Sequence, residues 1–169
     1  MGNTCKTVPV KKLSKNIFKG IGVVIVLSSV FLLVSCNSNQ KTSTPSQGGD
    51  ITITKSEITE TAKFFPYKSG NINMELLAVK APDGTIRTAF NTCQVCSNSG
   101  KGYYKQVGDE LVCQNCGNRF KISQIEKEKN GCNPVPILEE NKSDSGTAIT
   151  ISKSFLEQNV KLFGNWKKG

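Results

Sequence analysis

The stretch CQVCSNSGKGYYKQVGDELVCQNCG, residues 93–117, decides the fold, because it holds two Cys-x2-Cys pairs separated by sixteen residues. Two pairs at this separation are the arrangement of a four-thiolate metal site. Each pair is expected to form a tight turn that points both sulfurs at one position. Gly117 can adopt the positive φ that turns backbone amides toward the sulfurs. The predicted metal ligands are the four cysteines of these pairs: Cys93, Cys96, Cys113 and Cys116.

Other interpretations of the two pairs remain open. They could form two disulfides, or hold a metal ion that only stabilises the fold, since closed four-cysteine sites are most often structural. A thiol–disulfide oxidoreductase is disfavoured, because its Cys-x2-Cys motif usually lies near a βαβ pattern. The candidate cofactors are iron, as a single ion or an Fe–S centre, and zinc, with copper less favoured although thiolates also suit Cu(I).

A predicted hairpin leads into each pair. Residues 71–81 and 85–91 are expected to be strands joined by the turn Pro82-Asp83-Gly84-Thr85, in which Pro fixes φ and Gly supplies positive φ. This hairpin leads to Cys93. Residues 103–112 predict a second hairpin around Gly108-Asp109, which leads to the second pair. Three apolar residues after that pair are expected to be core contacts beside the site: Phe120, Ile122 and Ile125.

A similar short unit flanks the cysteine region on each side. The segments ITITKS (51–56) and ITISKS (149–154) match closely, and their Ile/Thr alternation predicts a strand in each. The likeness is expected to continue into residues 59–65 and 157–163. Ser154 with Glu157 fits a capping box, so a short helix is expected after the second strand. We expect the two copies to lie side by side and close the domain, although short low-complexity text can also match by coincidence.

These patterns predict a mainly β (α+β) domain over residues 51–166. Its expected architecture is a small sheet of hairpins that carries two Cys-x2-Cys knuckles in a zinc-ribbon or rubredoxin-like site. Two similar strand–helix units are expected to flank this sheet.

The first 50 residues predict export and membrane attachment. Lysines precede a fourteen-residue apolar run, residues 21–34, which is short for a membrane span and suits a secretory signal. The run ends in Leu33-Val34-Ser35-Cys36, which resembles a bacterial lipobox and implies a cleaved signal peptide over residues 1–35 and a lipid on Cys36. An uncleaved anchor is the alternative. Residues 36–50 are polar and predict a flexible tether, so the domain is expected at the outer face of the cytoplasmic membrane.

Charge and composition exclude several function classes. The formal charge of +9 includes five lysines that precede the apolar run, and the remaining 17 basic and 13 acidic residues form no stripe. Together with the predicted export, this argues against a nucleic-acid partner. The chain has no histidine, which excludes a Ser-His-Asp triad, a Cys2His2 site and an imidazole-bound haem.

Cys132 lies in the turn Gly131-Cys132-Asn133-Pro134 and has three open roles. It could be a further metal ligand, a free or redox-active thiol, or a buried small residue, because thiol reactivity depends on exposure.

The cysteine motifs also carry a family resemblance. The segments AFNTCQVC (89–96), GKGY (100–103), LVCQNCG (111–117) and GCNPVP (131–136), together with Phe120, resemble the FtrD-like family of membrane iron–sulfur-containing proteins. The resemblance spans residues 51–163. It implies a presumed electron-transfer component beside an iron permease, with a lipid anchor in place of the transmembrane helices found in many members. It also matches Cys132 to the cysteine of the family's Gly-Cys-Asn-Pro turn.

The expected function is therefore a surface-anchored metal–thiolate protein that transfers electrons or handles metal in iron uptake, and is more an electron-transfer or metal-binding protein than an enzyme. The alternative is a binding or scaffold module with a purely structural zinc. The three closely spaced cysteines of common Fe–S proteins are not present, so a single four-thiolate ion remains an alternative to a cluster.

Overall fold

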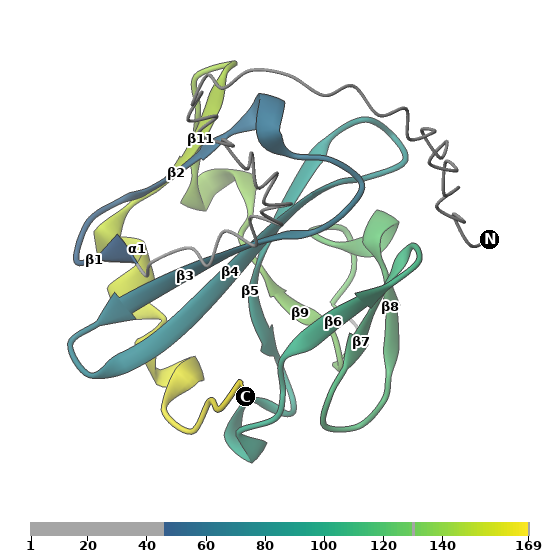
Figure 1. The fold of residues 1–169 in the computed structure, drawn as a ribbon, viewed down its shortest axis with the longest axis vertical. Coiled ribbons are helices and arrows are strands. Elements are labelled where there is room, and N and C mark those ends of the chain that lie inside the picture. Colours follow the sequence, from purple (N-terminus) through teal and green to yellow (C-terminus); the bar gives the residue numbers. More distant parts are fainter. Residues whose placement is uncertain (1–45, 130, 169) are drawn as a thin grey trace, which may run out of the picture. The chain divides into compact units, whose positions relative to one another are not determined.

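The computed structural model describes residues 46–129 and 131–168. The predicted signal peptide and the predicted lipid-bearing Cys36 lie outside these residues. Figure 1 shows the arrangement of the elements. The strands are β1 (Ser46–Gln47), β2 (Ile51–Thr54), β3 (Lys63–Ser69), β4 (Ile72–Lys80), β5 (Ile86–Cys93), β6 (Tyr104–Val107), β7 (Glu110–Cys113), β8 (Arg119–Lys121), β9 (Pro134–Pro136), β10 (Ser143–Asp144) and β11 (Ala148–Ile151). The helices are α1 (Lys153–Gln158) and the 3-10 helices η1 (Lys55–Glu57), η2 (Ser97–Ser99), η3 (Ile122–Gln124), η4 (Glu139–Asn141) and η5 (Val160–Phe163).

The strands form three sheets, which confirms the mainly β prediction. The first has the order β1-β3-β4-β5-β9, the second β10-β11-β2 and the third β6-β7-β8. Both predicted hairpins are present, since β4 pairs antiparallel with β5, and β6 pairs antiparallel with β7. Ser46–Gln47, at the end of the segment expected as a tether, pairs in parallel with β3 as β1.

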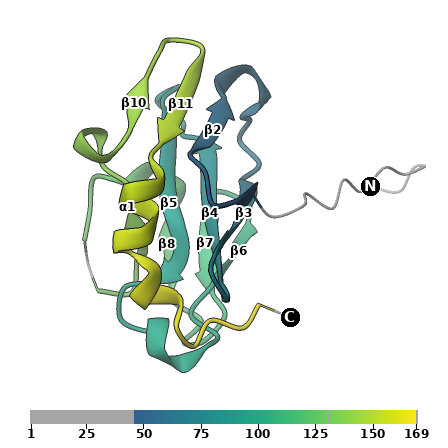
Figure 2. The ribbon, with the colours of Figure 1, turned by 90° about the vertical axis from the view of Figure 1, so that its left-hand side faces the viewer.

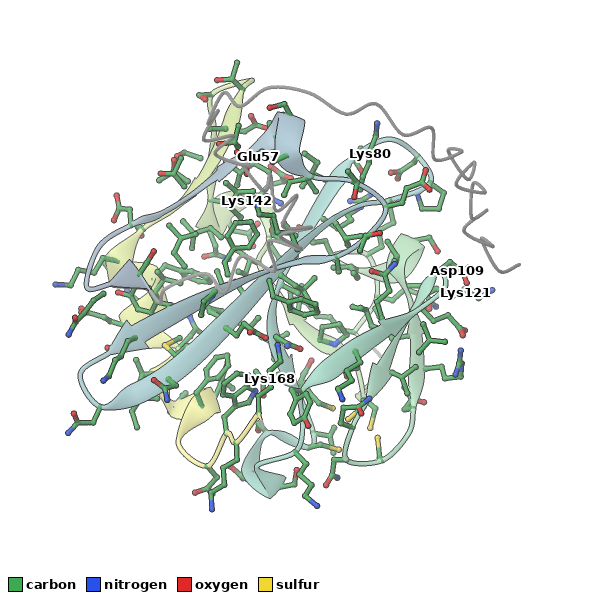
Figure 3. All side chains as sticks on the ribbon, viewed as in Figure 1. Glu57, Lys80, Asp109, Lys121, Lys142 and Lys168 are labelled. Atoms are coloured by element: carbon green, nitrogen blue, oxygen red, sulfur yellow. The ribbon has the colours of Figure 1, made fainter. Side chains whose placement is uncertain are left out.

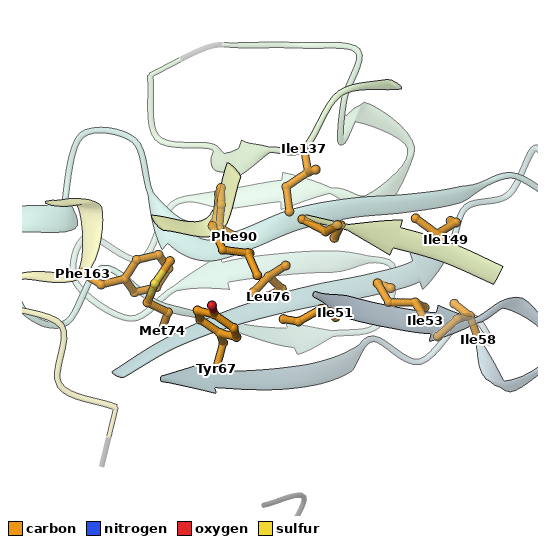
Figure 4. Packing of buried hydrophobic residues seen from close by; sticks show 13 residues of the cluster. Ile51, Ile53, Ile58, Tyr67, Met74, Leu76, Phe90, Ile137, Ile149 and Phe163 are labelled. Atoms are coloured by element: carbon orange, nitrogen blue, oxygen red, sulfur yellow. The ribbon is translucent and has the colours of Figure 1, made fainter. Parts of the chain in front are cut away.

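Strand β4 is buried on both faces and separates two hydrophobic cores. Met74, Leu76 and Ala78 belong to one core, whereas Leu77 and Val79 belong to the other. This division arises because successive side chains of a β-strand point to opposite faces of the sheet. The first core, shown in Figure 4, is completed by β2, β11, α1 and η5, and the second by the β6–β8 sheet and the cysteines. The first sheet is therefore the middle layer, with the β6–β8 sheet on one side of it.

The two similar segments do lie side by side. Strands β2 and β11 pair antiparallel, with Ile53 opposite Ile149 and Ile51 opposite Ile151, and all four side chains are buried. Figure 2 shows α1 following β11 along the same side of β5. The prediction that the two copies meet and close the domain is confirmed.

The likeness between the copies is shorter than expected. Residues 63–65 begin β3, which pairs along its whole length with β4, whereas residues 160–163 form the 3-10 helix η5. The predicted correspondence of these two segments is wrong, because pairing with a neighbouring strand outweighs local sequence preference.

The predicted capping box at Ser154 is also wrong. The N-cap of α1 is Ser152, whose side chain accepts a hydrogen bond from the Phe155 amide at 3.3 Å. Ser152 directly follows the buried end of β11 and keeps an extended backbone, which is the conformation that an N-cap residue adopts. The helix therefore begins two residues earlier than the capping-box pattern indicated.

Within the described part of the chain, none of the helices has both the length and the apolar character needed to cross a membrane.

Candidate metal centre

Five cysteines reach one end of the β6–β8 sheet from three segments. Cys93 ends β5, and Cys113 ends β7. Cys96 is the N-cap of η2, Cys116 lies in the turn before β8, and Cys132 lies before β9. In Figure 3 the yellow sulfur atoms gather at the end of this sheet opposite the labelled Asp109 and Lys121. Because each hairpin ends at a cysteine, the two knuckles are adjacent in the fold.

The sulfur atoms of these cysteines form a compact cluster. One group joins Cys93, Cys96 and Cys132, and a second joins Cys96, Cys113 and Cys116, with all sulfurs within a group less than 4.8 Å apart. The sulfurs of Cys116 and Cys132 are 3.6 Å apart. Four sulfurs bound at about 2.3 Å to one tetrahedral ion would be separated by roughly 3.8 Å, so the two groups, which share Cys96, are close enough for a thiolate metal site to form with small shifts of the side chains.

The two knuckles share one hydrogen-bond pattern. The backbone amides of Val95 and Cys96 donate to the sulfur of Cys93. The amides at the same offsets in the second pair, Asn115 and Cys116, donate to the sulfur of Cys113. Amides that point at a sulfur favour its thiolate form, which is the form that binds metal.

A glycine completes the second knuckle as expected. Gly117 has φ of +74°, and its amide donates to the Cys113 carbonyl at 2.9 Å. The backbone amide of Asn118 then donates to the sulfur of Cys116. The predicted role of Gly117 in turning this segment toward the sulfurs is confirmed.

Hydrogen bonds between the segments bring Cys132 to the knuckles. The Gln94 amide donates to the Asn133 carbonyl at 3.0 Å, which holds the residue after Cys132 against the first knuckle. The Asn118 side chain donates to the carbonyl of Cys132 itself at 2.9 Å, which ties it to the second knuckle. Three roles were considered for Cys132, and the structure excludes one of them, that of a buried small residue. Cys132 is half-buried and lies among the other thiols.

The site has a buried side and an exposed side. Cys93, Cys96 and Cys113 are buried, whereas Cys116 is exposed. Val95, in the first knuckle, is 64% exposed. The buried cysteines pack with the predicted core contacts Phe120, Ile122 and Ile125, which are confirmed as part of the same core. A metal held here would be sealed on the protein side and reachable from solvent near Cys116.

The pKa values of the clustered thiols are shifted in different directions by their surroundings. Burial raises the pKa of Cys113 to about 12. Burial also acts to raise the pKa of Cys93, but the neighbouring Tyr104 hydroxyl and the hydrogen bonds from the knuckle amides bring it below its ordinary value. The Asn118 amide lowers the pKa of the exposed Cys116. Burial, followed by the neighbouring Cys93, raises the pKa of the Tyr104 hydroxyl.

The donor set fits a soft or borderline metal. All five candidate ligands are thiols, which suit zinc, iron, an Fe–S centre or Cu(I), whereas calcium and magnesium require oxygen ligands. Two Cys-x2-Cys knuckles with amides directed at sulfur, a buried inner side and sulfurs at metal-site separations together make a cluster that can bind a metal. The structure brings together the four cysteines that the spacing predicted as ligands and Cys132, which was predicted as a possible further ligand.

Sequence reasoning did not single out Tyr104 as a site residue. It lies directly opposite Cys113 in the β6–β7 hairpin and is fully buried. Residues paired across an antiparallel ladder share a face. Counting back from the predicted Gly108-Asp109 turn would have placed Tyr104 on the same face as Cys113.

The carboxyl-terminal strap, Asn165–Lys168, was also not identified from sequence. The Lys167 amide donates to the Gly100 carbonyl at 2.8 Å, and the Trp166 indole donates to the Asn91 carbonyl at 2.9 Å. The Lys168 ammonium pairs with the buried Glu75 at 2.7 Å. The strap therefore holds the loop that follows Cys96.

Comparisons with known proteins agree with this site. A search of the curated proteins and a search of the solved structures each found no match. The family model described as membrane iron-sulfur containing protein FtrD-like matches residues 58–163, which are more than half of the chain and include all five clustered cysteines. The chain therefore belongs to the FtrD-like family of membrane iron–sulfur-containing proteins.

Proposed function

We propose that this protein is a surface-anchored metal–thiolate protein that carries electrons, or the metal itself, in an iron-uptake system. The observation that carries the proposal is the gathering of five cysteine sulfurs at one partly exposed site. Family membership adds the iron–sulfur character. The proposed ligands are the four knuckle cysteines, Cys93, Cys96, Cys113 and Cys116, with Cys132 as a further sulfur beside them.

The protein's own residues would perform three tasks at this site. The knuckle amides stabilise negative charge on the sulfurs of Cys93 and Cys113. The buried side, formed by residues such as Phe120 and Ile125, excludes water from the inner sulfurs. The exposed side at Cys116 and Val95 gives a partner protein close access. Bound iron would supply a one-electron change of oxidation state, which zinc does not.

The alternative function, a scaffold module with a purely structural zinc, also has support from the structure. Cys93 ends a strand of the first sheet and Cys113 ends a strand of the third, so a shared ion would link two sheets. A small domain often needs such a link. The exposed Cys116 and the presence of a fifth thiol favour the redox or metal-handling reading, because a site that only stabilises a fold needs four closed ligands.

The two readings are separated by metal content and redox behaviour. The full chain, purified in detergent without added chelator, is measured for iron and zinc per chain and for its absorption spectrum before and after reduction. We expect bound iron with thiolate-to-iron charge-transfer bands that bleach on reduction. A colourless protein with one zinc per chain, which takes up no iron on reconstitution, would exclude electron transfer by this site.

The anchor and the partner complete the proposal. A lipid on Cys36 would keep the domain at the outer face of the cytoplasmic membrane, where an iron permease or a redox protein is the expected partner. This placement is supported by the lipobox-like sequence and by the family's description as membrane proteins.

A further inference from the structure

One buried polar atom without a hydrogen-bond partner, the Tyr104 hydroxyl, lies beside the cysteine cluster. Five such side-chain atoms occur among the described residues, and three belong to Thr92, Tyr104 and Asn133. Of these residues, Tyr104 lies opposite Cys113 across the β6–β7 hairpin. A buried polar atom left without a partner costs about 1–3 kcal/mol. An unpartnered hydroxyl beside a candidate metal site is therefore to be explained by a group that completes its hydrogen bonding.

The Tyr104 hydroxyl lies beside a cysteine sulfur. Its side chain is fully buried, and the polar group beside its hydroxyl is the thiol of Cys93. A phenol is protonated at neutral pH, so the hydroxyl can act as a donor. A neutral thiol is a weak acceptor, whereas a thiolate is a strong, charged one.

The backbone amide of Tyr104 is held by a buried hydrogen-bond chain. Its amide donates to the Asn91 side-chain oxygen at 2.7 Å, and the same Asn91 side chain donates to Glu75 at 2.6 Å. Both Asn91 and Glu75 are buried. Because the Tyr104 side chain is itself fully buried, its ring has little freedom to turn the hydroxyl toward another group.

We propose that the Tyr104 hydroxyl donates a hydrogen bond to the sulfur of Cys93 when that sulfur is a metal-bound thiolate, and that this bond sets the reduction potential of the centre. The proposal rests on the proposed function in its assignment of Cys93 as a ligand. Tyr104 is a positioning and tuning residue that acts through Cys93. Hydrogen bonds to ligand sulfurs are one of the means by which proteins set the potentials of iron–sulfur centres.

The direction of the effect follows from charge. A donor directed at a thiolate reduces the electron density that the sulfur gives to the metal, and so stabilises the more negative, reduced state. Tyr104→Phe keeps the ring and removes only the hydroxyl, so it should lower the reduction potential. It should also move the thiolate-to-metal charge-transfer bands to longer wavelength, because the thiolate electrons are then held less tightly.

Two other tyrosines provide matched controls. Tyr103 is the neighbouring residue, and its ring stacks edge-on against Trp166 instead of packing at the sulfurs. Tyr67 has a buried hydroxyl without a partner, as Tyr104 does, but it lies in the other core. Tyr67→Phe therefore reports the effect of removing a buried hydroxyl on stability, and Tyr103→Phe reports the effect of a change beside the site.

The experiment uses the full chain in detergent, loaded anaerobically with Co(II) for the absorption spectrum and with iron for the potential. The Co(II) spectrum makes the test independent of redox activity. For Tyr104→Phe we expect the charge-transfer bands to shift and the ratio of affinities for oxidised and reduced iron to change about tenfold, which is about 59 mV for one electron. Tyr103→Phe and Tyr67→Phe should match wild type in both measurements.

The outcomes separate this proposal from the one on which it rests. A Tyr104→Phe spectrum and potential equal to wild type would overturn the role of Tyr104 while leaving Cys93 as a ligand. An equal shift in Tyr103→Phe would show that the effect is not specific to the Tyr104 hydroxyl, and would overturn the proposal. If Cys93→Ser kept the wild-type Co(II) charge-transfer spectrum, Cys93 would not be a ligand, and the proposed ligand set would fail first.

Discussion

The five clustered thiols are not equivalent as single residues. Cys113 is buried at the end of a strand, and two knuckle amides are directed at its sulfur. Cys132 lies outside both knuckles and is half-buried. Cys113→Ser should therefore reduce metal binding at least about tenfold, whereas Cys132→Ser leaves four knuckle thiolates and should retain wild-type metal content. Metal per chain, measured on the two variants purified in parallel, tests this difference.

A metal content that depended on Cys132 and not on Cys116 would contradict the proposed ligand set. If Cys132→Ser lost its metal and Cys116→Ser kept it, Cys132 would be the fourth ligand and Cys116 the spare thiol. The 3.6 Å separation of their sulfurs makes these two the pair to compare.

Asp83 gives a prediction about pH. Its carboxylate accepts hydrogen bonds from the Thr85 amide at 3.1 Å and from Arg87 and Lys127 at 2.6 and 2.9 Å. The hydrogen bonds from the Thr85 side chain and from Lys127 hold the pKa of Asp83 far below its ordinary value. A depressed folded-state pKa contributes stability that is present above the unfolded pKa of about 3.9 and is lost as pH falls toward the folded value.

Asp83→Asn should therefore lower the free energy of unfolding at pH 7, and the difference from wild type should shrink as pH falls below about 4. Urea unfolding at pH 7, 5 and 3 measures it. A difference that stayed constant across this range would show that the amide substitution acts by other means than charge.

Sequence spacing predicted some site residues and not others, for a physical reason. The four knuckle cysteines could be predicted because each pair is a local turn whose geometry depends on its own few residues. Cys132 could not be assigned, because its place depends on bonds from Gln94 and Asn118, which are far from it in sequence. Tyr104 could have been predicted from the register of the β6–β7 hairpin, which places it opposite Cys113.

At the scale of elements, the backbone at Gly102, just before β6, packs closely against the first knuckle. A Cβ added to Gly102 would lie 2.5 Å from the Cys96 carbonyl oxygen, and the Gly102 carbonyl accepts the Cys93 amide at 2.6 Å. Gly102→Ala should therefore push β6 away from the knuckle, destabilise the fold by about 1–3 kcal/mol and weaken metal binding. Thermal unfolding and metal content measure the two effects.

Gly49→Ala is the control for this substitution, because a Cβ there would have no atom within 4 Å. Wild-type metal content in Gly102→Ala would show that β6 can shift without moving Cys93 or Cys96. That result would contradict the view that this contact sets the geometry of the knuckle.

Elements with strong local signals were predicted, and elements defined by their neighbours were not. The two hairpins carry their own turn chemistry, Pro82-Asp83-Gly84-Thr85 and Gly108-Asp109, and both are present. Strand β3 has mixed, partly buried residues and no clean alternation, and it forms because β4 lies beside it. The helix start at Ser152 was missed because the end of β11, and not the capping pattern, sets it.

At the scale of the molecule, the proposed anchor makes Cys36 essential for membrane attachment. Wild-type protein should begin at Cys36 and carry a lipid mass, whereas Cys36→Ser should keep its leader, because the residue that receives the lipid is missing. Intact mass of the chain extracted from membranes distinguishes the two forms. A wild-type chain that keeps residues 1–35 and has no lipid would support the uncleaved anchor instead.

The layered architecture was only partly predictable. Mainly β composition, the central cysteine hairpins and the pairing of the two flanking segments all followed from sequence pattern. The separation into two cores did not, because it depends on β4 having two buried faces, and a strand buried on both faces loses the polar alternation that identifies a half-buried strand. The strap that reaches Gly100 and Asn91 depends on contacts over more than 60 residues.

The most direct test of the central claim is the ligand shell of the metal in the full-length protein, measured by X-ray absorption at the metal edge. A site built by the gathered cysteines predicts a shell of sulfur alone, with about four sulfurs at roughly 2.3 Å for a single tetrahedral ion and metal neighbours in addition for a cluster. A shell that contains nitrogen or oxygen ligands, or a folded protein without metal whose cysteines are joined as disulfides, would contradict it.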